Sequence, residues 1–160
     1  MIQRIQTIYF IIVMVLLSSL LSGVEIFGFQ TANNYCSYSV YGVQSYKSAA
    51  SVAHAKAENI QGSVLFYFVI AFVLFLYLAL MAYKNLKRQF VLTRIALSLY
   101  AIALLALLLF GSFGLIVKGA VGIELGIGYY ISVVGLPIIY FAYKGVKKDK
   151  DLLESLDRLR

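Results

Sequence analysis

Four long apolar stretches separated by polar segments dominate the hydropathy pattern of the 160-residue chain. They run from about residue 5 to 29, 63 to 83, 95 to 117 and 125 to 143. A transmembrane helix needs about 20 apolar residues at about 1.5 Å each, so each stretch is long enough to cross a bilayer. Helices are expected because backbone polar groups in lipid must be hydrogen-bonded within the chain. The pattern predicts an all-α membrane protein, a bundle of four transmembrane helices forming one domain over residues 1–160.

The first stretch could also be a secretory signal peptide, because one cation, Arg4, precedes a long apolar run. Signal cleavage requires small residues at alternate positions, and the sequence SSLLSGVEIFGFQ offers no such pair. The run is also longer than the apolar region of most signal peptides. We therefore expect residues 5–29 to remain as the first helix.

Basic residues predict the orientation of the helices. Eleven of the 14 lysines and arginines lie at the amino terminus, in the segment 84–94 or in the tail 144–160, and three lie elsewhere. Short loops rich in Lys and Arg stay on the cytoplasmic side of a membrane. Both termini and the segment 84–94 are therefore predicted to be cytoplasmic, and the formal net charge of +7 has a mostly topological origin. Binding to nucleic acid is unlikely, because no stacking platform or known binding fold accompanies the cations.

The predicted outer loop, residues 30–62, has a tyrosine-rich part followed by an alanine-rich part. Its tyrosines suit the membrane interface, but they also make the loop a candidate interaction surface: Tyr35, Tyr38, Tyr41 and Tyr46. The alanine-rich part, 49–57, has high helix propensity and predicts a short helix that Gly62 separates from the second span.

Candidate chemistry is sparse, since 62% of the residues are hydrophobic and only 13% are charged. His54 is the only histidine and Cys36 the only cysteine, so neither a His/Cys metal site nor an intramolecular disulfide is predicted. Glu25 and Glu124 are interpreted as interfacial helix ends rather than as parts of an ion pathway. No catalytic, cofactor or metal site is predicted, and we do not expect an enzyme.

The tail resembles a short amphipathic helix, because leucines recur at positions 152, 156 and 159. This helix either stays solvated or docks onto the inner loop, the lipid headgroups or a cytoplasmic partner. Our hypothesis is that it folds back and pairs Glu154 or Asp157 with Lys87 or Arg88. Pro137 should kink the fourth span, because proline removes a helix hydrogen bond.

Three segments, MIQRIQTIYF, YKNLKRQF and SLDRLR, together resemble a bacterial membrane family described as domain of unknown function 4293. The resemblance implies a small four-span protein of the bacterial inner membrane with no established activity. It also implies a signature on the cytoplasmic face, to which our charge-pairing argument adds Arg88 and Glu154. The candidate residues of this face are Gln3, Arg4, Gln6, Lys87, Arg88, Gln89, Glu154, Asp157, Arg158 and Arg160.

Two functional classes fit these features. The first is a structural or accessory subunit of a larger membrane complex, whose partner is another membrane protein or a second copy of the chain. The alternative is a binder or carrier of an apolar ligand such as a lipid or quinone, for which a cleft is expected near Pro137 and its neighbouring tyrosines, Tyr129, Tyr130 and Tyr140.

Overall fold

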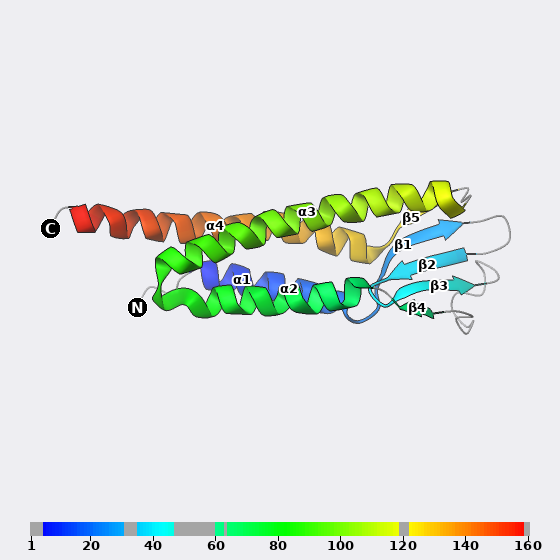
Figure 1. Cartoon of the computed structure of the whole chain (residues 1–160), viewed down its shortest axis with the longest axis horizontal. Coiled ribbons are helices and arrows are strands. Elements are labelled where there is room, and N and C mark those ends of the chain that lie inside the picture. The colour runs from blue at the N-terminus through cyan, green and yellow to red at the C-terminus, as the bar shows by residue number, and fades with distance from the viewer. Residues whose placement is uncertain (1–4, 31–34, 47–59, 63, 119–121, 159–160) are drawn as a thin grey trace.

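The computed structural model of the chain describes residues 5–30, 35–46, 60–62, 64–118 and 122–158. Its helices are α1 (Ile5–Leu20), α2 (Val64–Met81), α3 (Leu86–Lys118) and α4 (Ile127–Arg158), with a 3₁₀ turn, η2 (Ala82–Lys84), between α2 and α3. Its strands are β1 (Glu25–Gln30), β2 (Tyr35–Ser39), β3 (Gly42–Tyr46), β4 (Ile60–Gly62) and β5 (Gly122–Leu125). The helices lie side by side along the long axis, and the strands gather at one end (Figure 1). We call this the sheet end, and the opposite end, which holds η2, the turn end.

The sheet shows that the prediction of an all-α protein was wrong. Its five strands are ordered β4-β3-β2-β1-β5, and all neighbouring pairs are antiparallel. In the centre, Gly28 of β1 is aligned with Ser37 of β2 on one side and with Glu124 of β5 on the other. The sheet therefore joins the predicted end of the first helix, the predicted outer loop and the residues just before the fourth helix.

The first helix ends at Leu20, well before the predicted residue 29, because the chain turns at Gly23. Gly23 has a φ of 83°, a left-handed conformation that favours glycine, and its N–H donates to the Leu20 carbonyl over 3.2 Å. The residues beyond it include Ile26, Phe27 and Phe29, which suit strands because β-branched and aromatic side chains pack well on a pleated sheet. A glycine cap and strand-forming residues thus convert the end of the apolar run into β1.

Three helical segments within the described residues are long and apolar enough to cross a membrane: Val64–Lys84, Leu86–Gly111 and Ile127–Leu152. Their length and composition are typical of a membrane protein. The described part of α1 has 16 residues and forms a shorter apolar helix. Where four spanning helices were predicted, the described residues therefore provide three.

The basic stretch 84–94, predicted to be a loop, is mostly helical. Helix α3 begins at Leu86, directly after Asn85, whose side-chain oxygen accepts a hydrogen bond from the Arg88 N–H over 3.4 Å. The Asn85 carbonyl also accepts from the Gln89 N–H over 2.9 Å. Asn85 thus caps α3 as asparagine commonly does at this position, and it leaves a short turn between the two helices.

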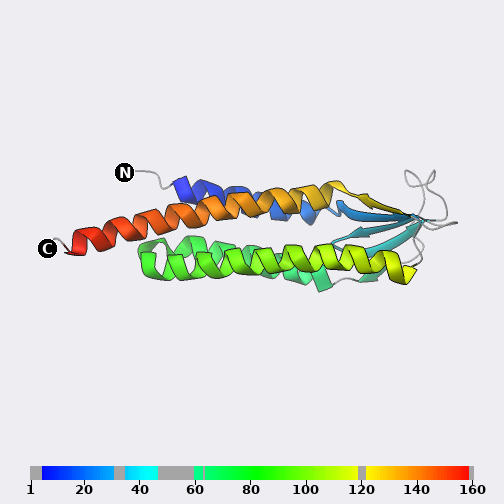
Figure 2. The same ribbon diagram turned by 90° about the horizontal axis from the view of Figure 1, so that it is seen from above.

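The prediction of a separate C-terminal helix was also wrong, because α4 continues without interruption to Arg158. Figures 1 and 2 show its last turns projecting beyond the turn end of the other helices. No proline occurs after Pro137, and several lysines and leucines of good helix propensity follow Gly145, so the helix has no reason to stop there. The tail therefore does not fold back onto the start of α3.

The core of the bundle lies where α1 packs along α4 and α4 packs along α3. Phe10 and Val13 of α1 and Ile139, Ala142 and Val146 of α4 are fully buried there. Helix α2 packs against α1 and less extensively against α3. Helices α2 and α3 diverge from their shared turn toward the sheet (Figure 1). This divergence leaves space between α2 and α3 near the sheet.

Candidate functional site

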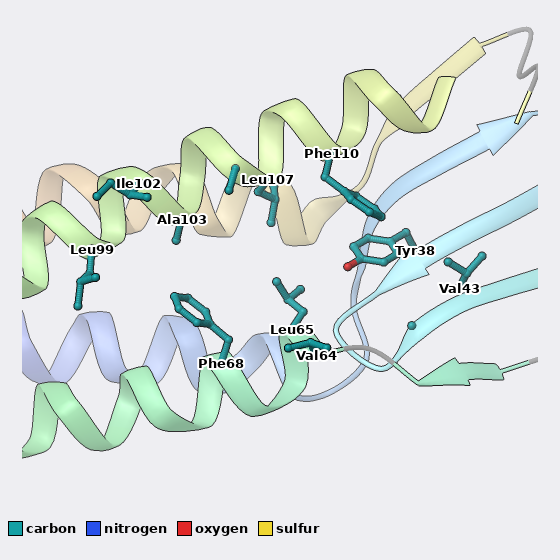
Figure 3. A pocket seen from close by; sticks show the side chains of 12 residues that line it. Tyr38, Val43, Val64, Leu65, Phe68, Leu99, Ile102, Ala103, Leu107 and Phe110 are labelled. Atoms are coloured by element: carbon teal, nitrogen blue, oxygen red, sulfur yellow. The ribbon is translucent and has the colours of Figure 1, made fainter. Parts of the chain in front are cut away.

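A groove of about 630 Å³ lies between α2 and α3 beneath the sheet (Figure 3). Its walls are the first turns of α2, the second half of α3 and the β2–β3 hairpin. The lining residues are Tyr38, Gly42, Val43, Val64, Leu65, Phe68, Leu99, Ile102, Ala103, Ala106, Leu107 and Phe110. Its volume falls within the range of about 300–1,000 Å³ that is usual for small-molecule sites.

The lining is apolar except at the sheet end. Ala103 and Ala106 supply small side chains on α3, and Phe68 of α2 contributes the facing wall. Tyr38 carries the only polar side-chain atom among the twelve lining residues. In Figure 3 its phenolic oxygen faces the space between α2 and α3, while its ring packs against Phe110 with the ring centroids 4.8 Å apart. The site therefore combines a long apolar wall with one hydroxyl at the sheet end.

A second, smaller cavity of about 60 Å³ lies deeper in the bundle and shares Leu65, Phe68, Ala103 and Leu107 with the groove. It reaches Tyr100 and Ser132, which are joined by a hydrogen bond from the Tyr100 hydroxyl to the Ser132 carbonyl over 2.6 Å. The four shared side chains therefore form the boundary between the groove and the core.

On the sheet, a polar cluster connects three strands. The Tyr35 hydroxyl donates to Glu25 Oε1 over 2.6 Å, and Gln30 Nε2 donates to Glu124 Oε1 over 2.6 Å. Burial, followed by the hydrogen bond to Glu25, raises the pKa of Tyr35 well above its ordinary value, and the Glu124 charge adds to this effect. Glu25 and Glu124, interpreted from the sequence as helix ends, thus lie in strands and bind side chains of the sheet.

Three of the four candidate tyrosines of the predicted outer loop have described side chains, and these three do not form one surface. Tyr35 and Tyr38 are both mostly buried, the first in the polar cluster and the second at the groove. Tyr41 is exposed in the β2–β3 turn, where it stacks on Phe66 and its hydroxyl donates to the Leu21 carbonyl over 2.5 Å. Tyr46 is aligned with Tyr35 at the end of β3. The alanine-rich helix predicted for 49–57 lies outside the described residues.

At the turn end, the signature residue Gln6 connects α1 to α4. Gln6 Nε2 donates to Asp149 Oδ2 over 2.6 Å, and only 3% of Gln6 is exposed. Gly145 allows this approach, because a Cβ there would lie 3.2 Å from Cβ of Gln6. Asp149 was not predicted as a site residue, because its position within a run of alternating charges gave no signal that it would face α1.

Gln89, also a signature residue, is 2% exposed and lies on the buried face of α3. Its carbonyl accepts a hydrogen bond from the Thr93 hydroxyl over 2.7 Å. The side-chain oxygens of Gln6 and Gln89 are buried, and neither has a hydrogen-bond partner among the residues that the structure describes. Next to Gln89, the Phe90 ring packs 5.5 Å from Tyr143, and the Lys150 ammonium lies 4.7 Å from the centre of the same ring.

Of the other residues of the predicted cytoplasmic signature, only Lys87 and Arg88 have described side chains. Lys87 and Arg88 are exposed on the first turn of α3. Glu154, Asp157 and Arg158 lie in the last turns of α4, where their side chains are not described, and Gln3, Arg4 and Arg160 lie outside the described residues. The structure thus unites Gln6 with Asp149 and buries Gln89, but it does not show the expected pairing of the tail with Lys87 or Arg88.

The apolar groove was expected near Pro137, and the structure places it on another part of the bundle. Pro137, Tyr130 and Tyr140 are exposed on α4, and Tyr129 packs against Phe27 of the sheet with the ring centroids 5.6 Å apart. None of the four lines the groove. Ala103 and Ala106 are small residues on α3, but Ala96 and Ala101 lie on the same helix, so the sequence contains no specific signal for the true position.

Fold and site together define a helical protein of membrane-spanning type with an antiparallel sheet at one end and an apolar groove below it. The chain belongs to the family described as domain of unknown function (DUF4293), which it matches over residues 2–159. This confirms the resemblance inferred from the three sequence segments. No curated protein matches the sequence.

Proposed function

We propose that the protein binds an apolar membrane ligand in the groove between α2 and α3, and that its role is binding rather than catalysis. The observation that supports this proposal is the groove itself, with about 630 Å³ of space and a lining that is apolar apart from the Tyr38 hydroxyl. A single phenol offers no nucleophile paired with a base, so the lining suits retention of a ligand better than its conversion. An apolar cavity with few, well-placed polar groups is the usual form of a ligand site.

The experiment is native mass spectrometry of the protein purified in mild detergent, combined with identification of the lipids and quinones extracted from it. Ala106→Trp should reduce the retained ligand at least fivefold, because the indole fills the groove. The matched control is Leu105→Trp, since Leu105 is the exposed neighbour of Ala106 and does not line the groove. No retained ligand, or equal retention by parent, variant and control, would exclude this function.

A role as an accessory subunit is the second proposal, and the extension of α4 favours it. Helix α4 continues past the turn end of the bundle (Figure 1), and Leu152, near the end of this helix, is 55% exposed. An exposed leucine beside charged residues suits a protein partner on that side. Cross-linking in membranes should produce a discrete heteromeric or homomeric product that Leu152→Glu abolishes. Persistence of the product in this variant would argue against the α4 extension as the contact.

We further propose that the protein lies in the bacterial inner membrane with both termini and the turn end in the cytoplasm. The cations of the first turns of α3 and of α4 beyond Tyr143 support this orientation through the positive-inside rule. In a Cys36→Ser background, Tyr41→Cys at the sheet end should react with an impermeant maleimide in spheroplasts. Asn85→Cys should react only after the membrane is permeabilised, and the opposite pattern would invert the proposed orientation.

A further inference from the structure

We infer that the ligand of the α2–α3 groove is a lipid of the outer leaflet, bound through one acyl chain that runs along α3 from Phe110 toward Leu99, with its polar end at Tyr38. This inference rests on the proposed function and on the proposed orientation, and it specifies the ligand class and its direction. It depends on the length of the groove, on the position of its one hydroxyl and on its opening toward lipid.

The length of the groove matches one leaflet. Along α3 its lining extends from Leu99 to Phe110, which at 1.5 Å per residue is about 16 Å. The hydrocarbon core of a bilayer is about 30 Å thick, so this distance is about half of it. On the other wall, the lining uses only the first turns of α2, from Val64 to Phe68, and therefore stays in the same half.

A partner helix fits this space poorly. A helix with a diameter of about 10 Å and a rise of 1.5 Å per residue would place only about five residues in 630 Å³. A transmembrane partner would also need a contact surface along most of the bundle, whereas the groove lining reaches only Phe68 on α2 and Leu99 on α3, and the two helices converge toward their turn (Figure 1). A flexible acyl chain, in contrast, needs no contact surface beyond the groove.

The polarity of the lining orients the ligand. Tyr38 lies in the strand that covers the sheet end of the groove, so its hydroxyl is at the level expected for the ester and headgroup region of a lipid. The opposite end is lined by Leu99, Ile102 and Ala103, which suit the methyl end of a chain. A quinone fits less well, because its two ring carbonyls require hydrogen-bond donors and the lining provides one phenol.

The acyl chain of the lipid can enter the groove laterally from the bilayer. Val64, Phe68, Leu99 and Ile102 line the groove and are also exposed on the outer surface of the bundle, on both sides of the gap between α2 and α3. Lateral entry requires no passage of the headgroup through the bundle, since the headgroup stays at the sheet end throughout.

The absence of tryptophan from the sequence allows a direct test, because an introduced tryptophan is the only one in the protein. Phe110→Trp and Leu99→Trp place this reporter at the two ends of the groove. Leu109→Trp is the matched control, because Leu109 is 59% exposed beside Phe110 and does not line the groove. Each variant is reconstituted with phospholipids brominated near the carboxyl end or near the methyl end of the acyl chain, and quenching is measured before and after dilution into lipid-free detergent.

We expect bromine near the carboxyl end to quench Phe110→Trp at least twofold more than bromine near the methyl end, and the reverse for Leu99→Trp. Both groove reporters should remain quenched after dilution, whereas the Leu109→Trp control should recover. Equal recovery of all three variants, or the same preference at both ends of the groove, would overturn the inference. Ile102→Trp replaces Leu99→Trp if the latter does not elute as the parent protein does.

The outcome also separates this inference from the proposed function. If mass spectrometry shows a retained quinone that Ala106→Trp displaces, the groove binds an apolar ligand and the acyl-chain inference fails. If no ligand of any class is retained, the proposed function fails and the inference fails with it. A retained phospholipid together with the expected quenching pattern supports both.

Discussion

Replacing Gly28 with alanine should destabilise the protein by breaking the polar cluster of the sheet. An added Cβ would overlap the Tyr35 hydroxyl and would lie 2.8 Å from Glu25 Oε1. The backbone cannot withdraw easily, because Gly28 lies in a central strand that is paired with β2 on one side and β5 on the other. The Tyr35 ring must therefore move, and its hydrogen bond to Glu25 is lost.

A hydrogen bond to a charged group contributes about 1.5–3 kcal/mol, which sets the expected loss in the free energy of unfolding. For a chain of this size, 1 kcal/mol corresponds to a change in melting temperature of about 2–4 °C. Gly28→Ala should therefore lower the melting temperature by about 3–12 °C.

The assay is thermal unfolding of the purified protein in one detergent, with Gly122→Ala as the matched control. Gly122 lies in the adjacent strand β5, and a Cβ there would meet no atom within 4 Å, so this variant should melt close to the parent. The losses of stability in Tyr35→Phe and Gly28→Ala should not be additive, because both substitutions remove the same hydrogen bond. Equal melting of Gly28→Ala and the parent, or an equal loss in Gly122→Ala, would refute the proposed overlap with Tyr35.

Two further predictions follow from the polar contacts. Because the pKa of Tyr35 is raised in the folded protein, its contribution to stability is complete below about pH 10 and is lost as the pH rises further, at up to about 1.4 kcal/mol per pH unit. Chemical unfolding at about pH 9 and 11 should therefore show a smaller loss of stability in Tyr35→Phe than in the parent, and identical losses would contradict this. At the turn end, Asp149→Ala should lower the free energy of unfolding by about 1–3 kcal/mol, because it leaves the buried Gln6 amide without its acceptor. Gln6→Leu should lower the free energy of unfolding by less, since Asp149 is only partly buried and water can replace the Gln6 amide as its hydrogen-bond donor. A larger loss in Gln6→Leu than in Asp149→Ala, in the same unfolding assay, would count against this explanation.

Apolar length predicted the long helices well because it reports a local property of the chain. The stretch 63–83 contains no charged residue, and α2 occupies residues 64–81 of it. The charged segments predicted the ends of the helices less well. Lysine and arginine have good helix propensity, so the basic stretch that looked like a loop begins α3, and the charged tail continues α4.

The sheet was missed because its sequence signals had another plausible explanation. Within YCSYSVYGVQSY, small polar and larger side chains alternate as in a strand only over residues 37–40, and Gly42 follows the turn of the β2–β3 hairpin. These tyrosines were interpreted as membrane-interface residues instead. The strand β1 was hidden in an apolar run whose length already satisfied the criterion for a helix.

The groove could not be predicted from the residues that form it. Leucines, alanines and phenylalanines at helical spacing also occur on any helix that faces lipid or packs in a core. The groove exists because α2 and α3 diverge from a short turn and a strand from elsewhere in the sequence covers the wider end. Gln6 and Gln89 were identified through the family resemblance, whereas Asp149 depended on the rotation of α4 relative to α1.

The first elements of the chain find their main partners in the last ones, and this has a consequence for biosynthesis. Helix α1 packs chiefly along α4, and β1 is completed on one side by β5. More than 100 residues separate the end of α1 from the start of α4, which at about 5–20 residues per second corresponds to a delay of about 5–20 s. During this interval Gln6 has no Asp149 to bind, and β1 has one exposed edge. The nascent chain must therefore be held by the insertion machinery or by lipid until α4 emerges, and the bundle closes only after α4 has been synthesised.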